Sequence, residues 1–202
     1  MRLQLAWLLL ATPSLCALDF RYSKITEIGE GGPQQYLQFA DGHNAVSYVP
    51  PKAWEYLGAS DRLRLLPTHV SEANIDISVR KLSTPLRVDE DELSTFEQLT
   101  RESLPQGAEK VELISAEPAP DMDGKPTIEF MLDYSFFGGR YRASFRYLTR
   151  GNDLVRFHVS CKAENFPALR KTFHASLHTF TGMANHSDGA SPQLFRSSVL
   201  LR

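Results

Sequence analysis

Residues 128–161 read IEFMLDYSFFGGRYRASFRYLTRGNDLVRFHVSC, and this stretch decides the fold. It contains three runs in which apolar and polar residues alternate, and glycine-containing turns separate these runs at 138–139 and 151–153. Alternation with period two is typical of a strand that buries one face, and glycine tolerates the positive φ that tight hairpin turns require. The stretch therefore predicts three antiparallel strands, joined first by a two-residue turn and then by a three-residue loop.

Helices are predicted on both sides of these strands. Downstream, Asn165 precedes a helix that has Pro167 in its first turn and ends at Gly182. The apolar stripe of this helix consists of Phe166, Leu169, Phe173, Leu177 and Phe180. Upstream, the acidic run 89–92 stands where the helix dipole favours negative charge, and Leu93, Phe96 and Leu99 follow it at helical spacing.

The remaining sequence before residue 128 predicts mostly short strands. These strands are expected at 20–28, 36–39, 45–49, 62–66, 73–82 and 111–116. One helical turn is predicted at 52–57, and a proline-rich loop at 117–124. Together with the hairpins, this order of elements indicates an α+β fold around an antiparallel sheet.

The composition describes one globular domain with few special features. The chain has 202 residues, 42% of them hydrophobic and 23% charged, and its formal net charge is −2. A charge so near zero gives no reason to expect nucleic acid as a partner. Two cysteines exclude both a disulfide-dense scaffold and a zinc site built from four thiolates. Cys161 continues the apolar series of its strand, so we expect its thiol to be buried.

Residues 1–17 have the order of a secretory signal peptide: a basic start, an apolar run and small residues at the end. We expect cleavage after Ala17, with Cys16 as the next choice. A buried N-terminal helix is the alternative, and the run is too short for a transmembrane segment. The protein is accordingly predicted to be extracytoplasmic, periplasmic or secreted. Residues 18–34 would form an N-terminal strand and linker, 35–181 the folded domain, and 182–202 a flexible tail.

The expected strand register places four basic side chains together. With the turns as predicted, Arg142, Arg146, Arg156 and His158 share one face of the sheet, behind the apolar face that carries Phe145 and Phe157. Clustered arginines suit a carboxylate, a phosphate or an acidic partner. The alternative is an ordinary solvated face balanced by Glu129 and Asp133, or a face that another element covers.

No catalytic motif is visible in the sequence. It contains neither a Gly-x-Ser-x-Gly pentapeptide nor a glycine-rich phosphate loop that leads into a helix. His174 and His178 have the i, i+4 spacing of metal ligands, although a border position beside the helix core is the simpler explanation. We therefore predict no enzyme activity and no cofactor. The alternatives are a metal-binding protein that uses His174, His178 and His158, or a hydrolase with an unfamiliar site.

Three features in sequence order resemble a known family. They are the proline–tryptophan segment Tyr48-Val49-Pro50-Pro51-Lys52-Ala53-Trp54, the helix with the acidic start, and the hairpins followed by a closing helix. This pattern, over residues 35–181, resembles the PsbP-like superfamily, and the leader fits its bacterial extracytoplasmic branch. The resemblance implies an α/β/α sandwich with a central antiparallel sheet, the fold of the photosystem II extrinsic subunit and of a Ran-binding import factor. It also implies an exported, non-catalytic accessory protein, sometimes with a bound metal ion, that contacts an unknown protein or a small anionic ligand.

Overall fold

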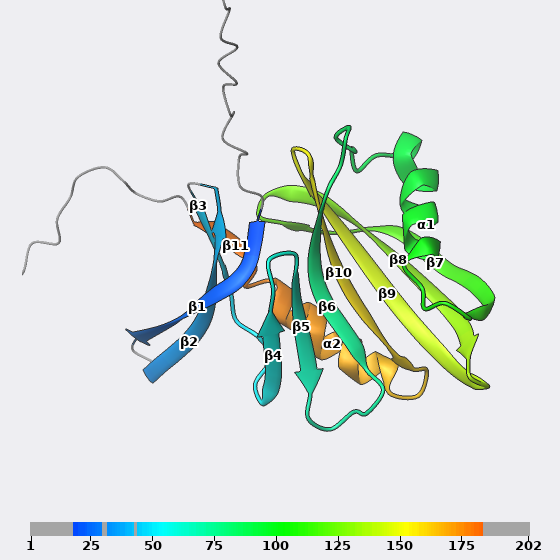
Figure 1. Ribbon diagram of the computed structural model, residues 1–202, viewed down its shortest axis with the longest axis horizontal. Helices are drawn as coiled ribbons and strands as arrows, with labels where there is room; N and C mark the ends of the chain where they lie inside the picture. The colour runs from blue at the N-terminus through cyan, green and yellow to red at the C-terminus, as the bar shows by residue number, and fades with distance from the viewer. Residues whose placement is uncertain (1–17, 30–31, 43, 184–202) are drawn as a thin grey trace, which may run out of the picture.

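The computed structural model describes residues 18–29, 32–42 and 44–183, and Figure 1 shows how they are arranged. The predicted leader, residues 1–17, lies outside the described residues, and so does the predicted tail from residue 184 onwards. Within the described ranges, no helix combines the length and the apolar character that crossing a membrane requires.

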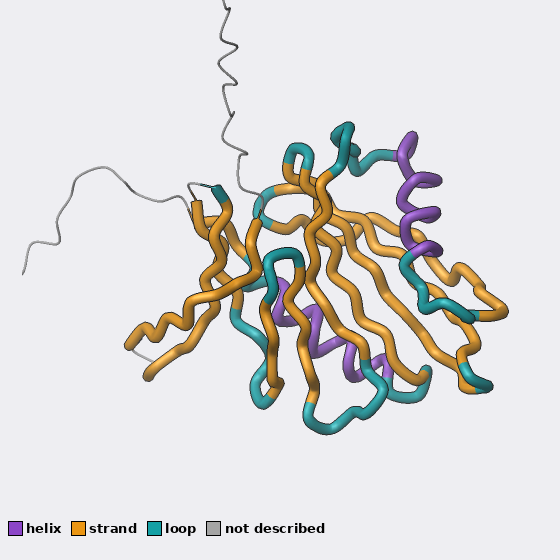
Figure 2. Tube along the Cα trace, in the orientation of Figure 1, coloured by secondary structure: helices purple, strands orange, loops and turns teal. Residues whose placement is uncertain are grey.

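A seven-stranded sheet forms the larger part of the fold (Figure 1, Figure 2). Its strands lie in the order β4 (Trp54–Gly58), β5 (Arg62–Pro67), β6 (Asn74–Lys81), β10 (Asp153–Lys162), β9 (Gly139–Arg150), β8 (Lys125–Phe136) and β7 (Glu109–Met122). All neighbouring strands are antiparallel. The three strands predicted from residues 128–161 are therefore adjacent, and the α+β class with an antiparallel sheet is confirmed.

A second sheet of four strands joins the two ends of the described chain. Its order is β1 (Leu18–Gly29), β2 (Gly32–Asp41), β3 (Asn44–Tyr48) and β11 (Thr181–Met183). The predicted turn at Asp41 and Gly42 links β2 to β3, and Gly42 has the positive φ of 63° that favours glycine there. Residues 182 and 183, expected in a flexible tail, are part of a strand instead.

The two helices pack on opposite faces of the seven-stranded sheet. α1 (Leu93–Glu102) follows the short 3-10 helix η1 (Glu90–Glu92) and contributes Phe96 to a core that contains Phe130 and Phe145. α2 (Phe166–Leu177) shares the other core with Phe157 and with the four-stranded sheet. The layer on the α2 side thus contains a second sheet, which the α/β/α sandwich does not include.

Buried aromatic side chains account for much of both cores, and their polar atoms have partners. The Tyr48 hydroxyl lies 2.7 Å from Ser176 Oγ, and the Tyr147 hydroxyl lies 3.0 Å from Thr100 Oγ1. Such pairing removes the cost of a buried hydroxyl. Cys161 is fully buried in the α2-side core, as predicted, and burial raises the pKa of its thiol to about 11.

The two hairpins differ from the prediction in different ways. In the first, Phe136 pairs with Gly139, so the turn is Phe137-Gly138, two residues out of the expected register. A shift of two leaves every side chain on its expected face. In the second, Arg150 pairs with Asp153, so the loop has two residues rather than three. A shift of one exchanges the two faces of the strand, and this moves the side chains of β10 relative to those of β9.

Three further local predictions were wrong. Residues 54–58 form the strand β4 rather than a helical turn, because Trp54 and Tyr56 alternate with exposed neighbours along the sheet. α2 ends at Leu177, although Phe180 remains buried beyond its end. The segment predicted as a loop at 117–124 mostly continues β7, which tolerates prolines because it is the edge of its sheet.

Candidate functional site

The four predicted binding residues do not share a face. Arg146 lies opposite Phe157, and Arg156 lies opposite Tyr147. Arg142 and Arg146 therefore face the α2 side of the sheet, whereas Arg156 and His158 face the α1 side. This correction follows directly from the shorter loop of the second hairpin. Phe145 and Phe157, expected on one apolar face, are likewise buried in opposite cores.

The guanidinium of Arg142 binds a carboxylate within the sheet. Its Nε lies 2.6 Å from Asp133 Oδ1, and its Nη2 lies 2.9 Å from Asp133 Oδ2, in a two-pronged ion pair across the β8–β9 ladder. Arg140 also donates to the same carboxylate. The hydrogen bonds from Arg142 lower the pKa of Asp133 below its usual range, so the carboxylate stays charged.

Arg156 and His158 belong to a buried network on the α1 side. Asp76 of β6 accepts from His158 Nδ1 and from Arg156 Nη2, each at 3.1 Å, and Arg156 Nη1 donates to Ser103 Oγ at 2.8 Å. Burial raises the pKa of Asp76, but its hydrogen bond with His158 and the charge of Arg156 outweigh burial and lower the pKa overall. The His158 ring also stacks on Phe145, with centroids 4.5 Å apart. This network ties β6, β10 and the end of α1 together.

Arg146 has a different environment, because it lines an open groove between β7 and α2. The groove has a volume of about 700 Å³, and its lining includes Glu129, Arg170, His174 and His178. Burial lowers the pKa of His174 to about 4, against the opposing charge of Glu129, so the imidazole is neutral at pH 7. The structure thus brings Arg146 together with the predicted histidine pair.

The predicted metal ligands do not converge. His158 lies on the opposite face of the sheet from His174 and His178. Among the described residues, no group of three His, Cys, Asp or Glu side chains is arranged to hold a metal ion. The His174 Nε2 atom instead lies 3.5 Å from Glu129 Oε1.

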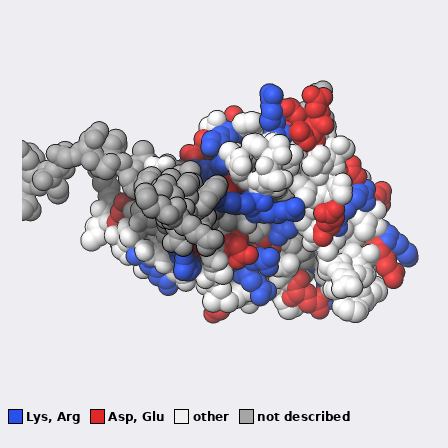
Figure 3. Space-filling model, turned by 45° about the horizontal axis from the view of Figure 1, so that its top comes forward, with Lys and Arg blue, Asp and Glu red and all other residues white. Residues whose placement is uncertain are grey.

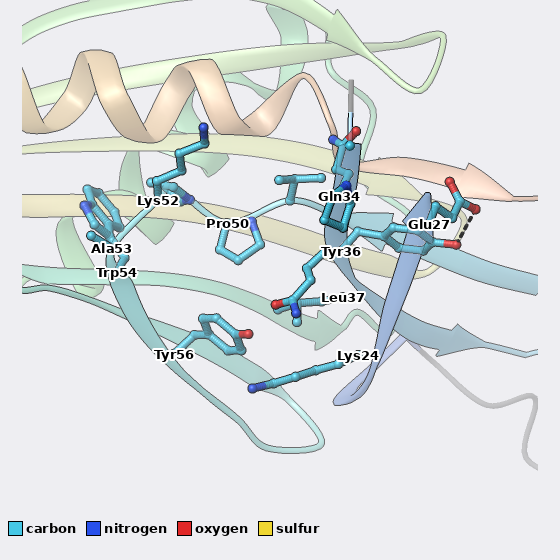
Figure 4. Close-up of a pocket in the computed structure, with 15 residues that line it drawn as sticks. Lys24, Glu27, Gln34, Tyr36, Leu37, Pro50, Lys52, Ala53, Trp54 and Tyr56 are labelled. Carbon is cyan, nitrogen blue, oxygen red and sulfur yellow. Dashed lines mark hydrogen bonds between the residues drawn. The ribbon is translucent and has the colours of Figure 1, made fainter. Parts of the chain in front are cut away.

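A second groove lies where the two sheets meet (Figure 4). It has a volume of about 690 Å³ between the β1–β2 hairpin, the loop from Val49 to Ala53, and β4. Figure 4 shows Trp54 and Tyr56 from β4 on one side of this groove and Tyr36 from β2 on the other. We call it the β2–β4 groove. Among its lining residues, all within the described chain, there is no serine, cysteine, histidine or aspartate.

The charged side chains that line the β2–β4 groove are Lys24, Lys52 and Glu27, and they differ in their contacts. Glu27 accepts a hydrogen bond from the Tyr36 hydroxyl at 2.9 Å, drawn as a dashed line in Figure 4. Lys52 is exposed at the rim, and Lys24 Nζ lies 5.2 Å from the centre of the Tyr56 ring. The cationic head groups can therefore meet a ligand, whereas the one lining carboxylate already has a partner.

Backbone strain marks the wall of the same groove. Ala53 has a φ of 63°, a left-handed conformation that is unfavourable for any residue with a Cβ atom. Such outliers persist only when the surroundings fix them, and they gather at binding sites. Ala53 directly precedes Trp54 and so sets the direction in which β4 enters the groove.

The residues of the β2–β4 groove were not predicted as a site. A helical turn was predicted at 52–57, although Trp54 and Tyr56 alternate with exposed neighbours. This alternation is the signal that could have identified β4. No local signal shows that the β1–β2 hairpin covers this strand, since the two segments meet only through the packing of the two sheets.

The chain is an α+β protein with open grooves on an antiparallel framework. The chain is similar to several solved structures, among them the following two. The solution structure of cyanobacterial PsbP (CyanoP) from Synechocystis sp. PCC 6803 has 18% sequence identity, covers 76% of this chain and 96% of that one, and gives a TM-score of 0.48. The crystal structure of PA94 from Pseudomonas aeruginosa, a protein of unknown function, has 11% identity, covers 78% and 95%, and gives a TM-score of 0.44.

The first of these structures bears the name of the family that the sequence pattern resembles. No family model matches the chain, and no curated protein matches it.

Proposed function

We propose that this chain is a binding protein without catalytic activity, which holds an extended, acidic segment of a partner protein in the β2–β4 groove. The observation that carries this proposal is the combination of a free sheet edge, half-buried aromatic rings and two available lysines in one groove.

The free edge comes from β4, which is the last strand of the seven-stranded sheet. In the part of the chain that the structure describes, β5 is its only neighbour in that sheet. An edge strand presents unpaired backbone N–H and C=O groups, and an extended peptide can add to it as a further strand. The backbone would then supply affinity, and side chains at alternate positions would supply specificity.

The side chains of the groove favour a particular kind of segment. Trp54, Tyr36 and Tyr56 offer large surfaces that lose little conformational entropy on binding. Lys24 and Lys52 favour carboxylates, and together they outnumber Glu27, the one carboxylate of the lining. An acidic segment with apolar residues at alternate positions fits both features.

The surroundings of the buried ionisable groups support the absence of catalysis. Asp76, Asp133 and Glu129 are each held by arginines of the same chain, which keeps them charged and occupied. A general base or an activated nucleophile requires a group that is free to exchange a proton with a substrate. Figure 3 shows acidic and basic groups interspersed on the face in view, so no large field of one sign dominates that face.

The proposed location follows from the leader, whose order of residues supports export to an extracytoplasmic compartment. Fractionation of the source cells, with detection of the processed chain, tests this part of the proposal. The partner must then be present in the same compartment.

Tryptophan fluorescence tests the groove directly, because the chain has only two tryptophans, Trp7 and Trp54. Trp7 belongs to the predicted leader, so in the chain without residues 1–17 Trp54 is the single tryptophan. Ten-residue acidic peptides with alternating apolar residues should change its emission saturably, and charge-reversed peptides should not. Lys24→Glu combined with Lys52→Glu should raise Kd about tenfold. Lys171→Glu, which changes an exposed lysine of α2 outside the groove, is the matched control.

A second set of peptides tests the strand-addition mode. Methylation of alternate peptide nitrogens removes backbone donors without changing side-chain charge, so it should abolish binding. Equal binding of acidic and basic peptides, or no binding of either, would contradict the proposal.

A further inference from the structure

We propose that Arg146 forms a separate site for a small oxyanion, a carboxylate or a phosphate, in the groove between β7 and α2. This site lies on the face of the sheet that α2 covers, and it goes beyond the peptide-binding role of the β2–β4 groove. Arg146 presents a buried guanidinium whose Nε has no hydrogen-bond partner.

Arg146 is only 5% exposed, yet it makes no side-chain hydrogen bond with any described residue. Its nearest acidic atom is Glu129 Oε2, 3.8 Å from Nη2, which is beyond hydrogen-bond distance. Its Nε is buried without a partner. A guanidinium carries five N–H donors, and a buried donor without a hydrogen bond is costly, so such a group in a folded protein points to a partner that completes it.

Glu129 does not satisfy these donors, because its nearest oxygen stays 3.8 Å from Nη2 and its hydrogen bonds come from Arg170 and Ser144. Arg170 donates to both, through Nε at 2.9 Å and Nη2 at 2.8 Å, and Ser144 donates to Oε1. Two guanidinium groups therefore stand beside one buried carboxylate at the base of the groove. The matched residue Arg142, on the same strand and face, shows the contrast, since both of its prongs bind Asp133.

The groove gives an anion access to Arg146. Its volume of about 700 Å³ exceeds what one small oxyanion fills, so the ligand can keep part of its hydration. Glu117, which lies opposite Glu129 in the β7–β8 ladder, also lines the groove, but it is exposed and its charge is screened by solvent. His174 and His178 at the other wall can donate hydrogen bonds. A planar, two-pronged donor such as Arg146 suits carboxylate and phosphate oxygens equally.

The test follows the Nε–Hε signal of Arg146 in the full chain by ¹⁵N-edited NMR. Sodium phosphate and sodium acetate are titrated separately, with sodium chloride holding the ionic strength constant. We expect a saturable shift of this signal, and a parallel rise in the thermal midpoint, with at least one of the two anions. Saturation by phosphate alone assigns the site to phosphates, saturation by acetate alone assigns it to carboxylates, and either result supports the proposal.

Three variants separate binding at Arg146 from general effects. Arg146→Met should raise Kd at least tenfold, and Arg146→Lys should weaken binding while preserving the charge. Arg142→Gln, the matched control, should leave Kd within twofold of the original. The proposal is overturned if neither anion shifts the Arg146 signal beyond the effect of chloride, or if Arg146→Met retains the anion-dependent rise in midpoint.

Discussion

Asp76→Ala removes the acceptor at the centre of the network on the α1 side. The Asp76 side chain is 3% exposed, and it is held by Arg156 Nη2 and His158 Nδ1 at 3.1 Å each. Removing one partner of a buried ion pair costs about 3–5 kcal/mol, because the remaining charge stays buried without compensation. For a chain of this size, each kcal/mol lowers Tm by about 2–4 °C, so we expect Tm to fall by about 6–20 °C.

The same carboxylate predicts how stability depends on pH. The folded pKa of Asp76 is lowered below its unfolded value of about 3.9. A depressed acidic pKa contributes stability that is present above the unfolded pKa and is lost as pH falls through the folded one. The difference in unfolding free energy between the original chain and Asp76→Asn should therefore shrink as pH falls below about 4.

Urea denaturation followed by Trp54 fluorescence and by circular dichroism measures both effects. Asp61→Ala, at an exposed aspartate, is the control and should change stability by less than about 0.5 kcal/mol. A loss below about 1 kcal/mol for Asp76→Ala at pH 7 would refute the reasoning, since it would show that solvent compensates Arg156 and His158 without the carboxylate.

Three smaller predictions concern the core, a turn and a close contact. Cys161 should not react with thiol reagents in the native state, because it is buried and its pKa is about 11, and its modification rate should follow unfolding when urea is added. Phe137→Asn should raise Tm, because Phe137 has a φ of 46° and is 93% exposed in a turn that favours asparagine; an unchanged or lower Tm would argue against turn strain. Gly58→Ala should destabilise the chain by about 1–3 kcal/mol in urea, since a Cβ atom there would stand 2.2 Å from the Phe20 carbonyl oxygen, and a neutral result would mean that β1 can shift.

The antiparallel core of the fold could be predicted from the sequence because its signal is local. In β8, β9 and β10, apolar and polar residues alternate for long enough to identify each strand without knowledge of its neighbours. The burial of Cys161 followed from the same alternation. The strand β11 could not be found in this way, because three residues are too few for a period and only the pairing with β3 creates the strand.

The residues of the candidate site were harder to predict, because their positions depend on the length of one loop and on contacts between distant segments. Which side chains share a face was decided by one residue of loop length, since Gly151 and Asn152 alone form the turn that was expected to have three residues. That single residue separated Arg156 and His158 from Arg142 and Arg146. The unused donors of Arg146 were likewise invisible, because the carboxylate expected to balance them is bound by Arg170 from a helix that lies far along the chain.

The two edges of the seven-stranded sheet are chemically unlike. β7 carries Pro118 and Pro120, which cannot donate to a neighbouring strand, whereas β4 contains no proline between Trp54 and Gly58. A continuous ribbon of copies needs two competent edges in every molecule, and this sheet has one. Association of molecules through edge-to-edge pairing of this sheet should therefore stop at two molecules. At high concentration, this sheet should give dimers and no continuous ribbon.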